Sequence, residues 1–170
     1  MDFGSKVCRS PSPDCGVCFG RDLCRAFQRG LQEDIPERTP RKLERISTAV
    51  AIFVRDGKVY LQRRAPEGLF AGMWEFPGGK VEEGELPREA TVREVEEELG
   101  AGCRPAEKLT DLVHYYTRFE VTLHAFICEA VEKLPVDEEH KWVGMDGIGD
   151  YPMPSANRKI VGRLERWMQE

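Results

Sequence analysis

The chain has 170 residues, of which 41% are hydrophobic, and a formal net charge of −5. This length suits one globular domain with an appendage, and the negative charge argues against a protein that coats nucleic acid. No apolar run reaches the ~18 residues of a membrane span, and the first residues, MDFGSKVC, lack the apolar core of a signal peptide. We therefore expect a cytoplasmic protein.

The charge is uneven along the chain. Residues 1–47 carry nine Lys and Arg against seven Asp and Glu, and the remainder carries sixteen against twenty-three. An acidic excess is expected where a site collects divalent cations for a phosphate substrate. The composition of the larger part of the chain is consistent with such a site.

Three zones follow one another. The first, residues 1–27, is rich in cysteine. The second, residues 28–45, is polar with prolines and indicates a linker. From residue 46 to residue 170 the composition is that of a globular domain.

Four of the six cysteines lie close together in the first zone, spaced C-x6-C-x2-C-x5-C. Thiols stay reduced in the cytoplasm, so this spacing favours metal ligation or free thiols over a disulfide framework. The remaining two are expected to be packing residues or free thiols. The clustered residues are Cys8, Cys15, Cys18 and Cys24, and the other two are Cys103 and Cys128.

The globular zone begins with strand signals. Residues 46–54 and 58–65, joined at Arg55-Asp56-Gly57, predict a β-hairpin with a turn that glycine permits. Residues 73–76, MWEF, predict a further short strand, ended by Pro77-Gly78-Gly79.

A helix is predicted over residues 86–100, with Pro87 in its first turn and Gly100 as its C-terminal cap. Its apolar stripe is Val92, Val95 and Leu99. Strands are expected around residues 107–116, 119–130 and 141–145, and a last helix over 155–168. The pattern predicts an α+β fold, a mixed sheet with helices packed on it.

The predicted helix carries an acidic face, because Glu94, Glu97 and Glu98 stand at i, i+3 and i+4. Such a face can be merely solvated. Hard carboxylate ligands on a rigid helix also suit Mg²⁺ bound together with substrate phosphates, and Arg93 can orient Glu97 by a charge-assisted hydrogen bond. The preceding loop brings four further residues to the helix start: Gly78, Gly79, Lys80 and Glu85.

Residues 79–101, GKVEEGELPREATVREVEEELGA, resemble the Nudix box at every defined position. The resemblance implies a Nudix α/β/α sandwich and Mg²⁺- or Mn²⁺-dependent hydrolysis of a nucleoside diphosphate linked to another group. It makes Glu94 a metal ligand and candidate base, and Glu97 and Glu98 ligands. Glu85 and Arg93 are then supporting residues. A further metal ligand is expected from the loop before Trp142, where Glu138 and Glu139 are the alternatives.

Two flanking segments resemble MutT-type Nudix enzymes, which hydrolyse oxidised guanine nucleotides: residues 61–80 and 150–164. This implies hydrolysis of 8-oxo-dGTP or a related purine nucleoside triphosphate to monophosphate and pyrophosphate, although another nucleotide stays open. By this resemblance Asn157 contacts the base and Arg64 the phosphates, with Phe76 and Lys80 near the site. An amide supplies both a donor and an acceptor for a modified guanine edge. The alternative for Asn157 is a surface residue in the first turn of the last helix.

The cysteine spacing is that of the [4Fe–4S] loop in MutY-type adenine DNA glycosylases, and residues 35–42, IPERTPRK, resemble their interdomain connector. Zinc is the alternative, although shorter spacings are more typical of zinc sites. The second functional hypothesis is therefore the non-catalytic 8-oxoguanine-recognition portion of such a glycosylase, which would bind duplex DNA when joined to a glycosylase domain. The glycosylase body is absent from these residues, so we expect no base excision from this chain.

Overall fold

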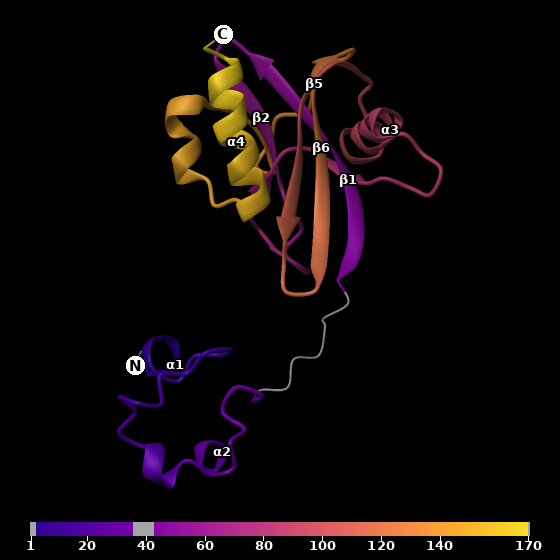
Figure 1. Cartoon of the computed structure of the whole chain (residues 1–170). Coiled ribbons are helices and arrows are strands. Elements are labelled where there is room, and N and C mark those ends of the chain that lie inside the picture. Colours follow the sequence, from indigo (N-terminus) through magenta and orange to yellow (C-terminus); the bar gives the residue numbers. More distant parts are fainter. Residues whose placement is uncertain (1–2, 36–42, 170) are drawn as a thin grey trace. The chain divides into compact units, whose positions relative to one another are not determined.

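The computed structural model describes residues 3–35 and 43–169. The chain divides into two compact units, Met1–Lys42 and Leu43–Glu170 (Figure 1). In the first unit the described elements are short: α1 is Phe3–Lys6, the 3₁₀ helix η1 is Arg21–Leu23, and α2 is Arg25–Gln28. Most of the predicted connector, residues 36–42, lies outside the described residues.

The predicted hairpin is confirmed in the second unit. Strand β1, Glu44–Arg55, pairs antiparallel with β2, Lys58–Arg63, through the partners Val54 and Val59. The two turn residues, Asp56 and Gly57, have φ values of 50° and 71°. This left-handed pair is the turn geometry that matches the twist of two antiparallel strands.

The described part of this unit holds a seven-stranded mixed sheet in the order β3-β2-β1-β6-β5, with β4 on β1 and β7 on β2. Strand β1 runs parallel to β6 and antiparallel to its other neighbours. The remaining strands are β3, Trp74–Glu75; β4, Gly78–Lys80; β5, Cys103–Tyr115; β6, Phe119–Ala130; and β7, His140–Gly144.

Two details differ from the sequence prediction. Gly78 and Gly79, predicted to end a strand, instead begin β4 and pair with Val50 and Ala49 of β1. Two glycines carry no strand propensity, but they allow the close backbone approach that this pairing needs. Strand β5 starts at Cys103 rather than at residue 107, with irregular pairing around Pro105 that hides the strand pattern.

Helices cover both faces of the sheet (Figure 1). On one face, α3, Pro87–Leu99, packs its buried Val95 and Leu99 against Phe53. On the other face lie α4, Ser155–Trp167, and the 3₁₀ helix η2, Met145–Asp150, where Ile160 packs against Ile52. Alternate residues of β1 therefore face opposite layers, as a strand requires, and the α+β sandwich is confirmed.

Cys103 and Cys128 are buried in the α3 layer with free thiols, as predicted. Among residues 3–35 and 43–169, no helix is long and apolar enough to cross a bilayer.

Candidate active site

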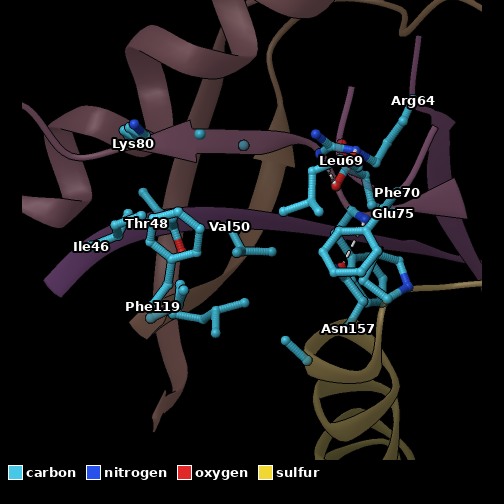
Figure 2. A pocket seen from close by; sticks show the side chains of 18 of the residues that line it. Ile46, Thr48, Val50, Arg64, Leu69, Phe70, Glu75, Lys80, Phe119 and Asn157 are labelled. Atoms are coloured by element: carbon cyan, nitrogen blue, oxygen red, sulfur yellow. Dashed lines mark hydrogen bonds and ion pairs between the residues drawn. The ribbon is translucent and has the colours of Figure 1, made fainter. Parts of the chain in front are cut away.

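A cavity of about 600 Å³ opens on the α4 face of the sheet. Figure 2 shows Arg64, Leu69, Phe70, Glu75 and Asn157 at one end of it, with Ile46, Thr48 and Phe119 toward the other. Strand β4 forms part of the wall, and Glu98 reaches the cavity from α3, on the opposite side of the sheet. Seven of the predicted site residues line it: Arg64, Phe76, Gly78, Gly79, Lys80, Glu98 and Asn157.

Arg93 ties the acidic face of α3 to the loop before it. Its Nε and Nη2 donate to the two carboxylate oxygens of Glu85, each at 2.9 Å. Its Nη1 donates to Glu94 at 2.9 Å and to Glu97 at 3.2 Å, and Nη2 also donates to the Lys80 carbonyl. The predicted contact with Glu97 is present, and the bidentate pair holds the pKa of Glu85 down at about 2.

Glu98 is held separately from the Arg93 network. Its Oε2 accepts hydrogen bonds from Gln62 Nε2 at 2.7 Å and from the backbone N–H of Gly78 at 2.9 Å. Although one side of the residue is exposed, the carboxylate lies against protein. This burial raises its pKa, and the nearby negative charges of Glu75 and Glu94 raise it further. Glu98 is thus the acidic-face carboxylate that lines the cavity and is poorly solvated.

The two glycines of β4 have different neighbours. Gly78 has a φ of 143°, and a Cβ there would lie 2.1 Å from the carbonyl oxygen of Ala49. A Cβ on Gly79 would lie 2.1 Å from the Glu94 carboxylate. Gly78 therefore permits the strand pairing, and Gly79 permits the Glu94 carboxylate to lie against the wall of the site.

The carboxylates of the acidic face are the kind of ligand that a hard divalent cation prefers, although they do not converge on one position in this structure. Among the described residues, no three His, Cys, Asp or Glu side chains stand close enough to hold a metal ion. Glu94 and Glu97 turn toward Arg93, whereas Glu98 turns toward Gln62. Crowded carboxylates, one with a raised pKa, are groups that a cation stabilises. The donor set therefore fits Mg²⁺ or Mn²⁺, which would compete with Arg93 for two of its members.

Asn157 is only 8% exposed, so it is not the surface residue of the alternative interpretation. It lies in the first turn of α4, and its Oδ1 accepts the backbone N–H of Phe76 at 3.2 Å. Its amide nitrogen donates no hydrogen bond to any described residue, and the side chain lines the cavity. Two N–H donors are therefore available to a ligand.

Arg64, predicted to contact phosphates, is paired with Glu75 in the structure. Its Nη1 lies 2.8 and 2.7 Å from the two oxygens of Glu75, and its Nε donates to the carbonyl of Leu69 at 3.0 Å. Burial raises the pKa of Glu75, and Arg64 partly offsets this. Phe76 is buried in the core, whereas Lys80 is exposed at the rim.

Among the described residues, no hydrogen bond or ion pair joins the side chain of Glu138 or Glu139 to the acidic face. Both are exposed in the loop before β7, and within the described residues neither carboxylate forms a hydrogen bond or an ion pair. The backbone of Glu139 is held next to β2, because its carbonyl accepts a hydrogen bond from the N–H of Arg63 at 2.7 Å. The assignment of a further metal ligand to either residue stays a prediction.

Sequence reasoning missed several residues of the site. Gln62 and Glu75 are polar residues next to apolar residues in the short strands β2 and β3. A polar side chain in such a strand could have marked each of them as a candidate site residue. Tyr116 and Phe119 flank one turn, whereas Phe70 lies more than 40 residues earlier and meets them only in the folded domain. No local pattern could have grouped Phe70 with the other two aromatic residues.

The four clustered cysteines line a separate cavity of about 100 Å³ within the first unit. All four thiols are free. Partial burial raises the pKa of Cys15, and the neighbouring thiols of Cys18, Cys24 and Cys8 raise it further. Gln32, which also lines this cavity, has a buried Oε1 without a hydrogen-bond partner among residues 3–35 and 43–169.

Known proteins resemble the chain over most of its length. The 8-oxo-dGTP diphosphatase of Escherichia coli (strain K12) is 30% identical over 128 residues, which cover 73% of this chain and 99% of the relative. The CTP pyrophosphohydrolase of the same organism is 33% identical over 122 residues, covering 70% and 90%. The crystal structure of MutT protein from Methanosarcina mazei Go1 matches with a TM-score of 0.67 at 26% identity, over 76% of this chain and 99% of that one.

A fourth, weaker match extends over both units. The adenine DNA glycosylase of Homo sapiens is 27% identical over 213 aligned residues, which cover 94% of this chain and 39% of the glycosylase.

The family model described as the NUDIX domain matches residues 48–163. This span lies within the second unit and contains the acidic helix, the two glycines of β4 and Asn157. Fold, residues and relatives agree, and the chain belongs to the Nudix family of hydrolases.

Proposed function

We propose that the second unit is a Mg²⁺- or Mn²⁺-dependent pyrophosphohydrolase of MutT type. It converts 8-oxo-dGTP, or a related purine nucleoside triphosphate, to the monophosphate and pyrophosphate. One observation carries the proposal: Glu98 of the acidic face and the unpartnered amide N–H groups of Asn157 line the same cavity. A group for phosphate chemistry and a group for base recognition are thus available to one ligand.

A divalent cation bound by Glu94 and Glu97 would neutralise phosphate charge and acidify a water molecule. Arg93 holds both side chains on the same face of α3. Glu98 lines the cavity, so we assign it, rather than Glu94, the role of accepting the proton of the attacking water. Water then attacks a phosphorus atom of the α–β phosphoanhydride, and this anhydride bond breaks to give the monophosphate and pyrophosphate.

Substrate choice in this proposal depends on the other end of the cavity. The free donors of Asn157 suit carbonyl or ring-nitrogen acceptors of an oxidised guanine. The Arg64 guanidinium can pair with phosphate when it leaves Glu75. Of the two bacterial relatives, named for 8-oxo-dGTP and for CTP, the first is covered over 99% of its length and supports a purine substrate.

A substrate panel tests the proposal. Purified protein is incubated with the four dNTPs, 8-oxo-dGTP and ADP-ribose, each with Mg²⁺ or Mn²⁺, and the products are separated by anion exchange. We expect 8-oxo-dGMP and pyrophosphate from 8-oxo-dGTP at the highest kcat/KM, and a loss of at least a hundredfold in Glu97→Gln. The proposal is wrong if no phosphoanhydride is cleaved with either cation.

A second proposal concerns the first unit, where we infer a [4Fe–4S] cluster on Cys8, Cys15, Cys18 and Cys24. Four free thiols around one cavity support it, as does the glycosylase match over both units. Four thiolates are the ligand count of a four-iron cluster, and the C-x6-C-x2-C-x5-C spacing is longer than those typical of zinc sites. The chain would then be the 8-oxoguanine-recognition part of a MutY-type glycosylase, acting in the cytoplasm with duplex DNA as partner.

Two measurements test this second proposal. We expect protein purified without oxygen to be brown, with about four iron atoms per chain, and Cys18→Ser to be colourless. Zinc in a colourless preparation would contradict the cluster. Binding of the full chain to duplex DNA that contains 8-oxoguanine, without turnover of any nucleotide, would favour the recognition module over the hydrolase.

A further inference from the structure

An aromatic wall closes one side of the nucleotide cavity. Phe70 and Tyr116 both line the cavity, and their ring centroids are 5.4 Å apart with an angle of 50° between the rings. Phe70 belongs to the loop between β2 and β3, whereas Tyr116 follows β5. Because the rings touch, a flat ligand cannot enter between them. Because they are inclined at 50°, it can stack on the face of one ring and meet the other ring at its edge.

The backbone of Phe70 is held in an unfavourable conformation. Its φ is +61°, in the left-handed region that bulky residues rarely adopt. Among the described residues, Asp56 is the one other non-glycine residue with positive φ. The conformation is maintained by loop hydrogen bonds: Arg64 Nε donates to the Leu69 carbonyl at 3.0 Å, and Arg63 Nε donates to the Gly72 carbonyl at 3.1 Å. Strain of this kind marks places where function needs a side chain in a given position.

Tyr116 is fixed from its other side by a chain of contacts that reaches α4. His114 meets the Tyr116 ring edge-on, with centroids 4.6 Å apart. Lys159 Nζ lies 3.1 Å from His114 Nδ1, and Ser155 Oγ lies 2.8 Å from its Nε2. A lysine ammonium can only donate, so Nδ1 accepts and Nε2 carries the hydrogen that is donated to Ser155. The helix that carries Asn157 therefore also positions Tyr116.

We propose that Phe70 and Tyr116 form a stacking surface for the base of the nucleotide, so that affinity depends on an aromatic base as well as on hydrogen bonds from Asn157. This inference rests on the proposed function and adds the group that selects for a flat ring. A base stacked on this wall would lie at the same end of the cavity as Asn157 (Figure 2). Stacking of a base on an aromatic side chain strengthens binding by roughly five- to hundredfold.

The test uses a substitution that removes the ring and also suits the backbone. Phe70→Gly places glycine at a φ that glycine adopts freely, and Asp56→Gly is the matched control at the distant hairpin turn. Dissociation constants for 8-oxo-dGMP and for 2-deoxyribose 5-phosphate, which lacks a base, are measured by calorimetry, and melting temperatures are recorded for every variant. Tyr116→Leu is the second variant, because it removes the other ring at a residue with ordinary backbone geometry.

We expect Phe70→Gly and Tyr116→Leu to bind 8-oxo-dGMP at least fivefold more weakly, with the melting temperature of Phe70→Gly close to that of Asp56→Gly. Binding of the sugar phosphate should not change. Unchanged 8-oxo-dGMP affinity in both variants overturns the inference, and so does a wild type that binds the nucleotide no better than the sugar phosphate. Failure of the proposed function is a separate result: a wild type that binds 8-oxo-dGMP through this wall but hydrolyses no triphosphate.

Discussion

The Asn157 amide makes one hydrogen bond within the described residues and leaves its N–H groups for a ligand. Its Oδ1 accepts the N–H of Phe76, and its amide nitrogen faces the cavity without a partner among the described residues. A ligand that offers no acceptor there would cover these N–H groups and leave them unpaired, at a cost of typically about 1–3 kcal/mol. A ligand acceptor that meets these donors therefore gains selectivity over one that does not.

Replacing the Asn157 amide separates its two contacts. Asn157→Asp keeps an oxygen for the Phe76 N–H but removes the N–H donors, whereas Asn157→Ala removes both. We expect each variant to lose the preference for 8-oxo-dGTP over dATP by roughly tenfold or more. Only Asn157→Ala leaves the backbone N–H of Phe76 unpaired. The measurement is kcat/KM for both nucleotides, and unchanged selectivity in both variants would show that Asn157 does not read the base.

Glu85 makes the stability of the domain depend on pH in a defined range. Arg93 lowers the pKa of Glu85 from its ordinary 4.5 to about 2, so the folded state binds this proton less readily than the unfolded chain. The stabilising contribution is then complete above about pH 4.5 and is lost as the pH falls toward 2. We expect the difference in unfolding free energy between wild type and Glu85→Gln to be constant above pH 5 and to shrink below pH 4.5.

Urea unfolding followed by circular dichroism at a series of pH values measures this difference. Glu83→Gln, at an exposed position in the same loop, is the control and should follow the wild type. A difference that stays constant down to pH 2 would contradict the role of the Arg93 pair.

Much of the acidic site could be predicted from the sequence because it lies on one helix, where spacing fixes the face. The positions of Glu94, Glu97 and Glu98 on α3 follow from 3.6 residues per turn. Their partners could not be predicted in the same way. Gln62 reaches Glu98 from β2, 36 positions earlier in the chain, and this contact exists only after the sheet has formed.

At the scale of elements, the two glycines of β4 make contrasting demands. Gly78→Ala would place a Cβ against the backbone of Ala49, and residue 78 would have to keep a φ of 143°, which alanine rarely adopts. Neither the Ala49 backbone nor this φ can change easily, because both belong to the paired strands. We expect a loss of roughly 2–5 kcal/mol in unfolding free energy. Gly79→Ala meets the far end of the Glu94 side chain, which can move. We expect this variant to lose less than about 1 kcal/mol but to lower kcat tenfold or more, because Glu94 is displaced.

Thermal unfolding and steady-state kinetics on both variants distinguish these effects. A destabilisation of the same size in the two proteins would mean that the Glu94 side chain does not move away from the added Cβ. Full activity in a folded Gly79→Ala variant would contradict the role given to Glu94.

Elements with a local signal were predicted, and those defined by distant pairing were not. Turn residues 55–57 marked the hairpin, and Pro87 and Gly100 marked the ends of α3. The parallel pairing of β1 with β6 joins segments more than 70 residues apart, so no local pattern indicates it. Strand β4 was missed because its glycines are chosen for close approach rather than for strand propensity.

At the scale of the whole molecule, the hydrolase is assigned to the second unit alone. Residues 43–170 form their own compact unit, and the Nudix family match lies inside it. We expect a truncated chain of residues 43–170 to melt cooperatively and to keep kcat/KM for 8-oxo-dGTP within about twofold of the full chain. A truncated domain that folds but is inactive would show that the cysteine-rich unit contributes to the reaction.

In the proposed mechanism, phosphoanhydride hydrolysis depends on the acidic face of α3. The most direct test compares kcat for 8-oxo-dGTP with Mg²⁺ in wild type, Glu98→Gln and Glu96→Gln. Glu96 lies on the same helix but does not line the nucleotide cavity, and it is the matched control. We expect a loss of about 10²–10⁴-fold in Glu98→Gln at unchanged melting temperature, and an unchanged rate in Glu96→Gln. Equal rates in all three proteins would contradict the proposed mechanism.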